Sequence, residues 1–239
     1  MKNISAITYK ELLIYFSSPM AYIIAGVFFT LTGVFFVSSI EGAFAEASAR
    51  ALFSNATYFL MPLIPPLLTM RLLAEEQKLG TLELLLTSPI RDYEIVVAKF
   101  LASFIILLAM TLFTLFYMLL LVVYQANPDI GPMISTYIGF ILYAMVALSI
   151  GLLASSLATN QIVAASVGFG IIFLFTILHR INEVIEGPIA TVIEHLSLLA
   201  HFESFSRGVM DTKDIAYFIV MTGVFLFLTI RSLESRRWR

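Results

Sequence analysis

The dominant pattern of the chain is a series of long apolar stretches separated by short polar segments. A transmembrane helix needs about 20 mostly apolar residues to cross roughly 30 Å of hydrocarbon. Six stretches come close to or exceed this length, and we place them at Met20–Ile40, Tyr58–Leu72, Val96–Tyr124, Ile134–Leu153, Ile162–His179 and Ala216–Ile230. The pattern predicts an all-α polytopic membrane protein with six transmembrane helices.

The second and third stretches have features of their own. Three prolines lie inside the second stretch, where they are expected to kink or unwind a helix; they are Pro62, Pro65 and Pro66. The third stretch is longer than one crossing requires, so we expect it to tilt or to project past the bilayer. Asp92 and Glu94 precede it, and acidic residues are favoured in the first turn of a helix.

A leucine pattern lies between these two stretches, in LAEEQKLGTLELLLTSPIRD, residues Leu73 to Asp92. Gly80-Thr81 offers a helix start and Ser88-Pro89 an end. Leucines recur within it at helical spacings of three and four, at Leu79, Leu82, Leu85 and Leu86. The segment is therefore predicted to form a short amphipathic helix that either lies on the membrane surface or docks in the groove of a partner.

Composition supports a membrane protein, with 60% hydrophobic residues, 13% charged residues and a mean hydropathy of +0.96. No cysteine is present, which excludes disulfides and thiolate metal sites. The formal net charge of −2 argues against a globally basic nucleic-acid-binding protein.

The basic residues are distributed unequally between the two sides of the predicted bundle. Only four fall on one side, at Arg50, Arg180, Arg207 and Lys213. Ten fall on the other, at Lys2, Lys10, Arg71, Lys78, Arg91, Lys99, Arg231, Arg236, Arg237 and Arg239. The positive-inside rule therefore predicts that both termini and the leucine segment are cytoplasmic and that the acid-rich segment from Arg180 to Asp214 is outside.

Two alternative interpretations are disfavoured by the sequence. The small residues AFAEASA, Ala43 to Ala49, resemble a signal-peptide cleavage site, but the apolar stretch before them is too long, so we expect an anchor. Beyond Gly187-Pro188, apolar residues predict a helix on the outer leaflet, at Ile189, Val192, Ile193, Leu196 and Leu199. A seventh crossing there would be costly because it would bury Glu194 and His195.

The inventory of catalytic and coupling residues is small. Arg71 and Arg180 lie at predicted span ends, where their side chains can reach the interface. Within the spans almost nothing is ionisable, whereas ion-coupled carriers usually bury ionisable residues along their pathway. No phosphate-binding G-x-x-x-x-G-K-[ST] loop occurs, so ATP hydrolysis would require a separate subunit. We therefore expect neither an enzyme nor a cofactor in this chain.

Two acidic groupings do not change that expectation. Glu75-Glu76 could suggest an intramembrane protease of the type with paired glutamates followed by an arginine. Here no arginine follows until Arg91, and the histidines that would assist the glutamates are predicted on the opposite membrane face. The remaining candidates match no metal-binding motif and are expected to be solvated; they are His195, His201, Glu194 and Glu203. We therefore expect no metal site.

Small residues recur four positions apart in the fourth and fifth stretches, which allows helix backbones to approach closely. The pairs are Gly151 with Ser155, Ala154 with Ala158, and Ala164 with Gly168. We interpret all of them as helix-packing positions.

The run EEQKLGTLELLLTSPIRDYEIVVAKF resembles the segment between the second and third membrane helices in permease subunits of the ABC-2 transporter family. YFSSPMAYIIAGVFF, GLLASSLATNQIVAA and HFESFSRGVMDTKDIAYF are similar to the gliding-motility and nitrous-oxide accessory permease branches of that family. The resemblance covers essentially the whole chain, as a single transmembrane domain over residues 1–239.

This resemblance implies a six-helix permease of a prokaryotic inner-membrane exporter, paired with a second copy or a paralogue. Two cytoplasmic ATPase subunits would bind ATP and Mg and receive the coupling helix in a groove. The coupling positions carried over are Glu75, Glu76, Gly80, Thr81, Leu82, Glu83, Leu85, Ser88 and Pro89. The resemblance also implies an N-terminal interfacial helix at Asn3 to Ser17 and short outer helices between the fifth and sixth spans.

Two other roles stay open at this point. In one, the chain does not transport and instead passes ATP-driven motion to a periplasmic or envelope partner through the segment from Arg180 to Asp214. In the other, it is a membrane scaffold without energy coupling, which the leucine segment argues against.

Overall fold

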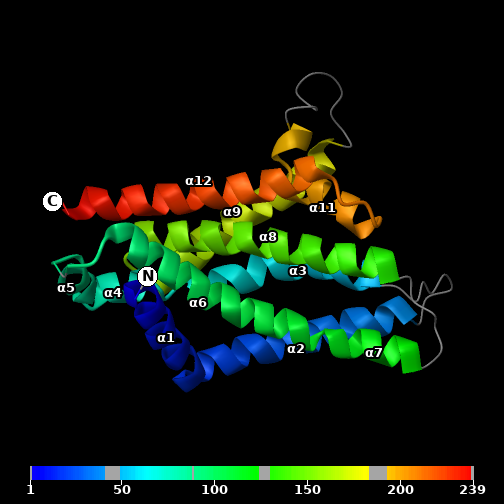
Figure 1. The fold of residues 1–239 in the computed structure, drawn as a ribbon, viewed down its shortest axis with the longest axis horizontal. Coiled ribbons are helices and arrows are strands. Elements are labelled where there is room, and N and C mark those ends of the chain that lie inside the picture. The colour runs from blue at the N-terminus through cyan, green and yellow to red at the C-terminus, as the bar shows by residue number, and fades with distance from the viewer. Residues whose placement is uncertain (1, 41–48, 88, 124–129, 183–192, 238–239) are drawn as a thin grey trace.

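The computed structural model describes residues 2–40, 49–87, 89–123, 130–182 and 193–237, and these residues form α-helices with no strand among them. Most of the helices run along one long axis (Figure 1). In chain order they are α1 (Lys2–Ser17), α2 (Pro19–Ile40), α3 (Ala49–Thr69), α4 (Ala74–Lys78), α5 (Thr81–Thr87), α6 (Asp92–Phe113), α7 (Leu115–Val123), α8 (Ile130–Leu157), α9 (Gln161–Asn182), α11 (Leu198–Ser206) and α12 (Thr212–Arg237).

Six helical segments are long and apolar enough to cross a membrane, which confirms the predicted fold class. They are Pro19–Ser39, Leu52–Lys78, Asp92–Leu121, Ile130–Leu157, Gln161–Arg180 and Thr212–Ser235. The chain is therefore an all-α, multi-pass membrane protein.

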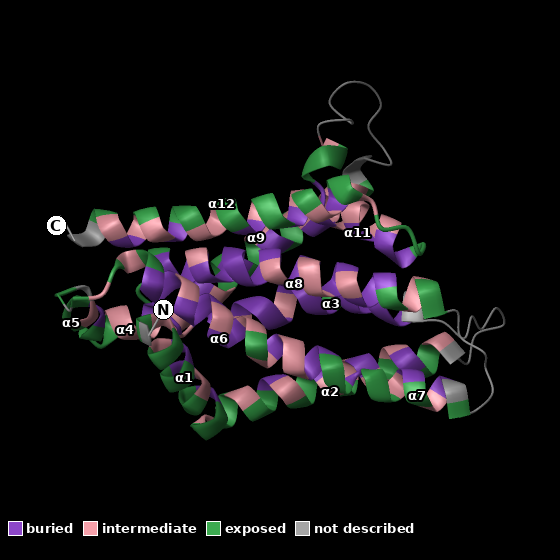
Figure 2. Ribbon diagram, in the orientation of Figure 1, coloured by how far each residue is buried: buried purple, intermediate pink, exposed green. Residues whose placement is uncertain are grey.

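The centre of the bundle is formed by α3 and α8. Both are buried along most of their length, whereas α2, α9 and α12 remain largely exposed on their outer faces (Figure 2). Helix α8 contacts α3, α6, α9, α11 and α12. Because the exposed residues of the outer helices are mainly apolar, these faces are suited to lipid or to another membrane subunit.

The second span begins earlier than the sequence predicted. The start at Tyr58 is wrong, because α3 is helical from Ala49 and buries Phe53 completely. The Phe53 ring packs against Tyr137, with ring centroids 4.4 Å apart. Asn55, on the other face of the helix, is exposed. The buried apolar face of α3 is therefore narrow here, and the residues before Tyr58 do not form a continuous apolar stretch in the sequence.

The three prolines of α3 do not unwind it. The helix is continuous through Pro62, Pro65 and Pro66 to Thr69, whose hydroxyl donates a hydrogen bond to the carbonyl of Pro65 at 2.9 Å. Proline is tolerated in a membrane helix where side chains and packed neighbours satisfy the backbone.

The third span starts as predicted and is divided near its far end. Asp92 and Glu94 lie in the first turn of α6, and Glu94 Oε2 accepts a hydrogen bond from the Arg91 amide at 3.1 Å. Thr114 separates α6 from α7, and its hydroxyl lies 3.1 Å from that of Tyr137.

Two ends of the bundle can be named from the elements found there. The α5 end holds α4, α5, the start of α1 and the last turns of α12, and the α11 end holds α11 (Figure 1). The start of α1 and the last turns of α12 thus lie at the same end of the bundle as the leucine segment.

The described residues that lead from the fifth to the sixth span, from 193 onward, are helical in two separate pieces. Residues 193–196 form one turn, and Ser197 then caps α11 by accepting a hydrogen bond from the Ala200 amide at 3.3 Å. A continuous helix through Leu199 is therefore wrong. Ile189, Val192 and Gly187-Pro188 lie outside the described residues.

Candidate functional site

The leucine segment forms two short helices at the α5 end. Gly80 separates α4 from α5 with φ of +71°, a left-handed conformation that favours glycine. Helix α5 runs from Thr81 to Thr87, which confirms the start and end predicted from Gly80-Thr81 and Ser88-Pro89. Leu79 is the C-cap of α4, so the prediction that it shares the apolar face of α5 is wrong.

The leucines of this segment divide into an inward set and an outward set. Leu82 is only 4% exposed and belongs to the core of the chain, and Leu85 packs partly against that core. Leu79 and Leu84 are 66% and 72% exposed. Leu82, predicted as an anchor in a partner's groove, instead holds α5 on its own bundle, and the outward leucines are the ones a partner can contact.

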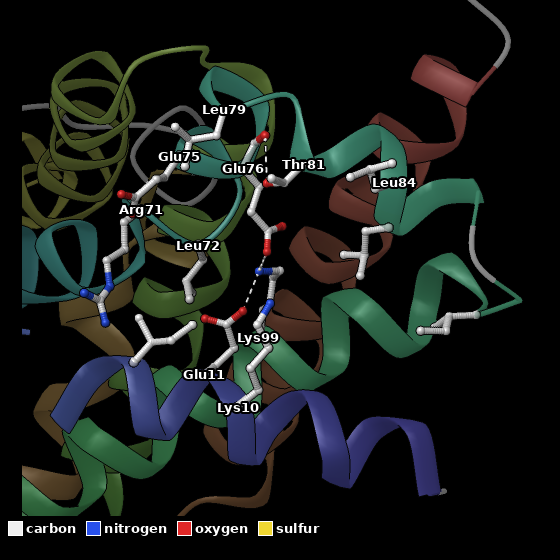
Figure 3. A pocket seen from close by; sticks show the side chains of 13 residues that line it. Lys10, Glu11, Arg71, Leu72, Glu75, Glu76, Leu79, Thr81, Leu84 and Lys99 are labelled. Atoms are coloured by element: carbon white, nitrogen blue, oxygen red, sulfur yellow. Dashed lines mark hydrogen bonds and ion pairs between the residues drawn. The ribbon is translucent and has the colours of Figure 1, made fainter. Parts of the chain in front are cut away.

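A buried charge cluster lies beneath α4. The ammonium of Lys99 on α6 is 2.8 Å from Glu11 Oε1 on α1 and 2.8 Å from Glu76 Oε1 on α4 (Figure 3). The Lys99 side chain is 1% exposed. We call these three residues the Lys99 cluster. It ties three elements together, because separating any of them would leave a buried charge without its partner.

Helix α4 is also bound to α8. The Ser155 hydroxyl accepts hydrogen bonds from the amides of Leu73 and Ala74, both at 3.1 Å, and donates to the carbonyl of Met70 at 3.0 Å. These contacts satisfy backbone groups at the junction of α3 and α4 that no helix pairs. Gln77 Nε2 donates to the carbonyl of Ser156 at 2.9 Å.

The end of α3 is bound to α1 through Tyr15. Burial raises the pKa of Tyr15 well above its usual range, so the phenol stays protonated and donates to the carbonyl of Leu68 at 2.6 Å. The guanidinium of Arg71 lies over the Tyr15 ring, 4.2 Å from its centroid. Arg71 was expected only to reach toward the interface, and its contact with Tyr15 adds a link between α1 and the segment after α3.

A cavity of about 510 Å³ opens between α1, α4, α5 and α6 (Figure 3). Its lining joins the Lys99 cluster to Glu75, Leu79 and Leu84. The outward leucines therefore lie next to a charged hollow, an arrangement suited to a partner that presents both apolar and polar side chains.

The remaining positions carried over by resemblance occupy the outer surface of the segment. Glu75 is half-buried, and the exposed ones are Gly80, Thr81, Glu83 and Pro89. Ser88 lies outside the described residues. Thr81 Oγ1 donates to the carbonyl of Glu76 at 3.4 Å.

The small residues chosen for helix packing lie where α3, α8 and α9 meet. A methyl group added to Gly151 would collide with the Thr69 hydroxyl. One added to Gly168 would lie 3.3 Å from Pro66 Cβ. Ala164 is buried together with Met70 and Ala158, and Ser155 makes the hydrogen bonds described above. Close approach of α8 and α9 to the proline region of α3 depends on this lack of side-chain volume.

Two of the four residues that could have supplied a metal site, His201 and Glu203, form ion pairs instead. His201 Nδ1 is 2.7 Å from Asp214 Oδ1, and Glu203 pairs with Arg207 at 2.7 Å. Within the described part of the chain, no group of three or more potential ligands could hold a metal ion.

A family model described as ABC-2 family transporter protein matches residues 2–236. The chain belongs to the ABC-2 transporter family. Among curated proteins, none matches it significantly. Its membership makes it a membrane permease of the ABC transporter class, a transport subunit rather than an enzyme; the narrower branch stays a prediction.

Sequence reasoning missed the Lys99 cluster and the link made by Ser155. Glu11 is 88 residues from Lys99 in the chain, so no local pattern joins them. One signal was present, because Lys99 falls inside an apolar stretch where an unpaired charge would be costly.

Proposed function

We propose that this ABC-2 protein is the permease subunit of an exporter in which separate ATPase subunits hydrolyse ATP and drive a substrate across the membrane. The permease would act with a second copy or a close paralogue and with two ATPase subunits, which bind the ATP and Mg. It would form one transmembrane domain in a prokaryotic inner membrane, with both termini cytoplasmic and no cofactor or metal of its own.

The attachment of α4 and α5 carries this proposal. Helix α4 is bound to α1 and α6 through the Lys99 cluster and to α8 through Ser155. A force applied to the exposed face of this segment would therefore reach the second, third and fourth spans together. A passive loop between two membrane helices would not need bonds to three packed elements.

The exposed face offers the contacts that an ATPase groove requires. Leu79 and Leu84 would be the apolar anchors, and the exposed Glu83 would lie at the polar rim. Leu82 and Leu85 would support this face from within. The coupling role thus keeps the segment from Leu73 to Pro89 but assigns the anchors to different leucines.

Copurification of the ATPase subunit tests the proposal. Leu79→Asp and Leu84→Asp together should reduce its recovery at least tenfold, because apolar interface anchors contribute about 2 kcal/mol or more each. Leu196→Asp is the matched control, since Leu196 is also exposed but lies near α11. Its recovery of the ATPase should equal that of the unmodified chain.

Equal recovery with the double variant and with the control would reject the coupling role. It would instead favour a segment that lies on the membrane surface. Leu82→Asp is not suitable for this test because it would disrupt the core beneath α5.

A further inference from the structure

The histidines of the chain gather at one end of the bundle. The sequence contains three, His179, His195 and His201, and all lie at the end of α9 or in the segment that leads through α11. Imidazole is the side chain that ordinarily changes charge between about pH 5 and 8. A change in histidine charge would therefore act at the α11 end.

His201 is placed between two oxygen acceptors. Its Nδ1 atom lies 2.7 Å from Asp214 Oδ1 on α12, and its Nε2 atom lies 3.3 Å from the carbonyl of His195. The ring stacks on Tyr217 with centroids 3.8 Å apart, which fixes its plane. Only an imidazolium can donate from both nitrogens, since neutral histidine has a single N–H.

The carboxylate of Asp214 makes the charge of His201 important. Asp214 is buried, and its second oxygen has no hydrogen-bond partner among the described residues. A buried carboxylate is costly unless a nearby positive charge compensates it. His201 is the group in direct contact that can supply this charge.

A second histidine and carboxylate face each other on the opposite side of α11. His179 Nε2 on α9 lies 3.9 Å from Glu203 Oε2 on α11. Helix α11 thus has one such pair toward α12 and one toward α9. It also packs on α8, where the Ser135 hydroxyl donates to the carbonyl of Phe205 at 2.8 Å.

We propose that these two pairs form a proton-dependent clasp that holds α11 across the ends of α8, α9 and α12. With both rings charged, the clasp is complete. When the rings lose a proton, His201 keeps one of its two hydrogen bonds and both ion pairs are lost. Attachment of α11 therefore weakens on deprotonation of the rings.

Other charged groups lie near the clasp and have partners of their own. Glu203 also pairs with Arg207 at 2.7 Å, and Lys213, next to Asp214, pairs with Asp211 at 3.1 Å. The hydrogen bond from the Lys213 amide holds the pKa of Asp211 below its usual range. Arg180 adjoins His179 in the sequence, and Glu194 adjoins His195. Among these side chains, imidazole is the type that ordinarily changes charge between about pH 5 and 8.

Hydrogen–deuterium exchange of the full chain in lipid nanodiscs tests the clasp. Amide protection of residues 198–206 is compared at about pH 6 and about pH 8, after correction for the intrinsic pH dependence of exchange. Protection of α11 should fall by about tenfold at the higher pH, the factor expected for loss of one charge-assisted hydrogen bond. Protection in the middle of α8 should not change.

Three variants assign the effect to its residues. His201→Gln should remove most of the pH dependence, while His195→Gln should keep it because His195 contributes its carbonyl. Asp214→Asn should lower protection at about pH 6 toward the value of the unmodified chain at about pH 8. Equal corrected protection of α11 in the unmodified chain at both pH values would overturn the proposal, as would undiminished pH dependence in His201→Gln.

Discussion

At the scale of single residues, Lys99 is the most constrained charge at the α5 end. Its ammonium is buried and contacts one oxygen of each of two carboxylates from different helices. Removing one member of a buried ion pair is far more harmful than replacing the whole set by neutral groups. The Lys99 cluster is therefore suited to keep α1, α4 and α6 in register. Apolar side chains at the same positions would fix the relative positions of these helices less precisely.

Lys99→Met should lower the free energy of unfolding by about 3–5 kcal/mol, because it leaves Glu11 and Glu76 buried without a counter-ion. Unfolding in mixed detergent micelles measures this. Lys10→Met, at an exposed neighbouring position, should change stability by less than about 0.5 kcal/mol.

A triple variant provides the decisive comparison for the cluster. Lys99→Met combined with Glu11→Gln and Glu76→Gln should recover most of the lost stability, since no isolated charge remains. If Lys99→Met were no more harmful than Lys10→Met, the cluster would not be a structural bond in the folded chain.

At the scale of elements, the central contact is that of α3 with α8 and α9. Gly151 and Gly168 let the backbones of α8 and α9 approach the turn of α3 that contains Pro65 and Pro66. The same region continues into α4 through the hydrogen bonds of Ser155. Close packing in the spans and attachment of the leucine segment therefore depend on one junction.

Gly151→Ala should destabilise the chain by about 1–3 kcal/mol, because its methyl group would collide with Thr69 and overpacked cores lose stability on this scale. Gly170→Ala is the matched control in α9, since a Cβ there would meet no atom within 4 Å. It should be neutral or slightly stabilising, because alanine favours helix over glycine. Equal midpoints for the two variants in thermal unfolding would contradict the packing argument.

The sequence predicted some elements well and others poorly for physical reasons. An apolar run of membrane length predicts a span without further information, so the six spans could be predicted directly from the sequence. The start of α3 could not be predicted, because Ser54 and Asn55 interrupt the apolar pattern. The limits of α5 were visible in Gly80 and Pro89. The sequence did not show which leucines are exposed to a possible partner. The spacing of leucines predicts an apolar helix face, but it does not indicate whether that face packs on the same chain.

At the scale of the whole molecule, the two ends of the bundle differ in chemistry. The α5 end carries the buried Lys99 cluster and exposed leucines, whereas the α11 end carries histidine–carboxylate pairs. Between them, α3 and α8 form a buried centre surrounded by helices with apolar outer faces (Figure 2). Under the proposed function, this polarity would allow one end to receive a mechanical input and the other to respond to conditions on the opposite side of the membrane.

The orientation of these ends in the membrane can be tested by thiol labelling, because the chain contains no cysteine. The excess of basic residues at the α5 end predicts that it is cytoplasmic. Cysteines introduced at Thr87 and Ser235 should then be protected from an impermeant reagent added to intact cells, whereas Met210→Cys should react. All three positions are exposed, so burial does not limit the reaction. Permeabilised cells provide the control, in which all three should label. Labelling of Thr87→Cys in intact cells would reverse the orientation and place the exposed leucines where no cytoplasmic ATPase could reach them.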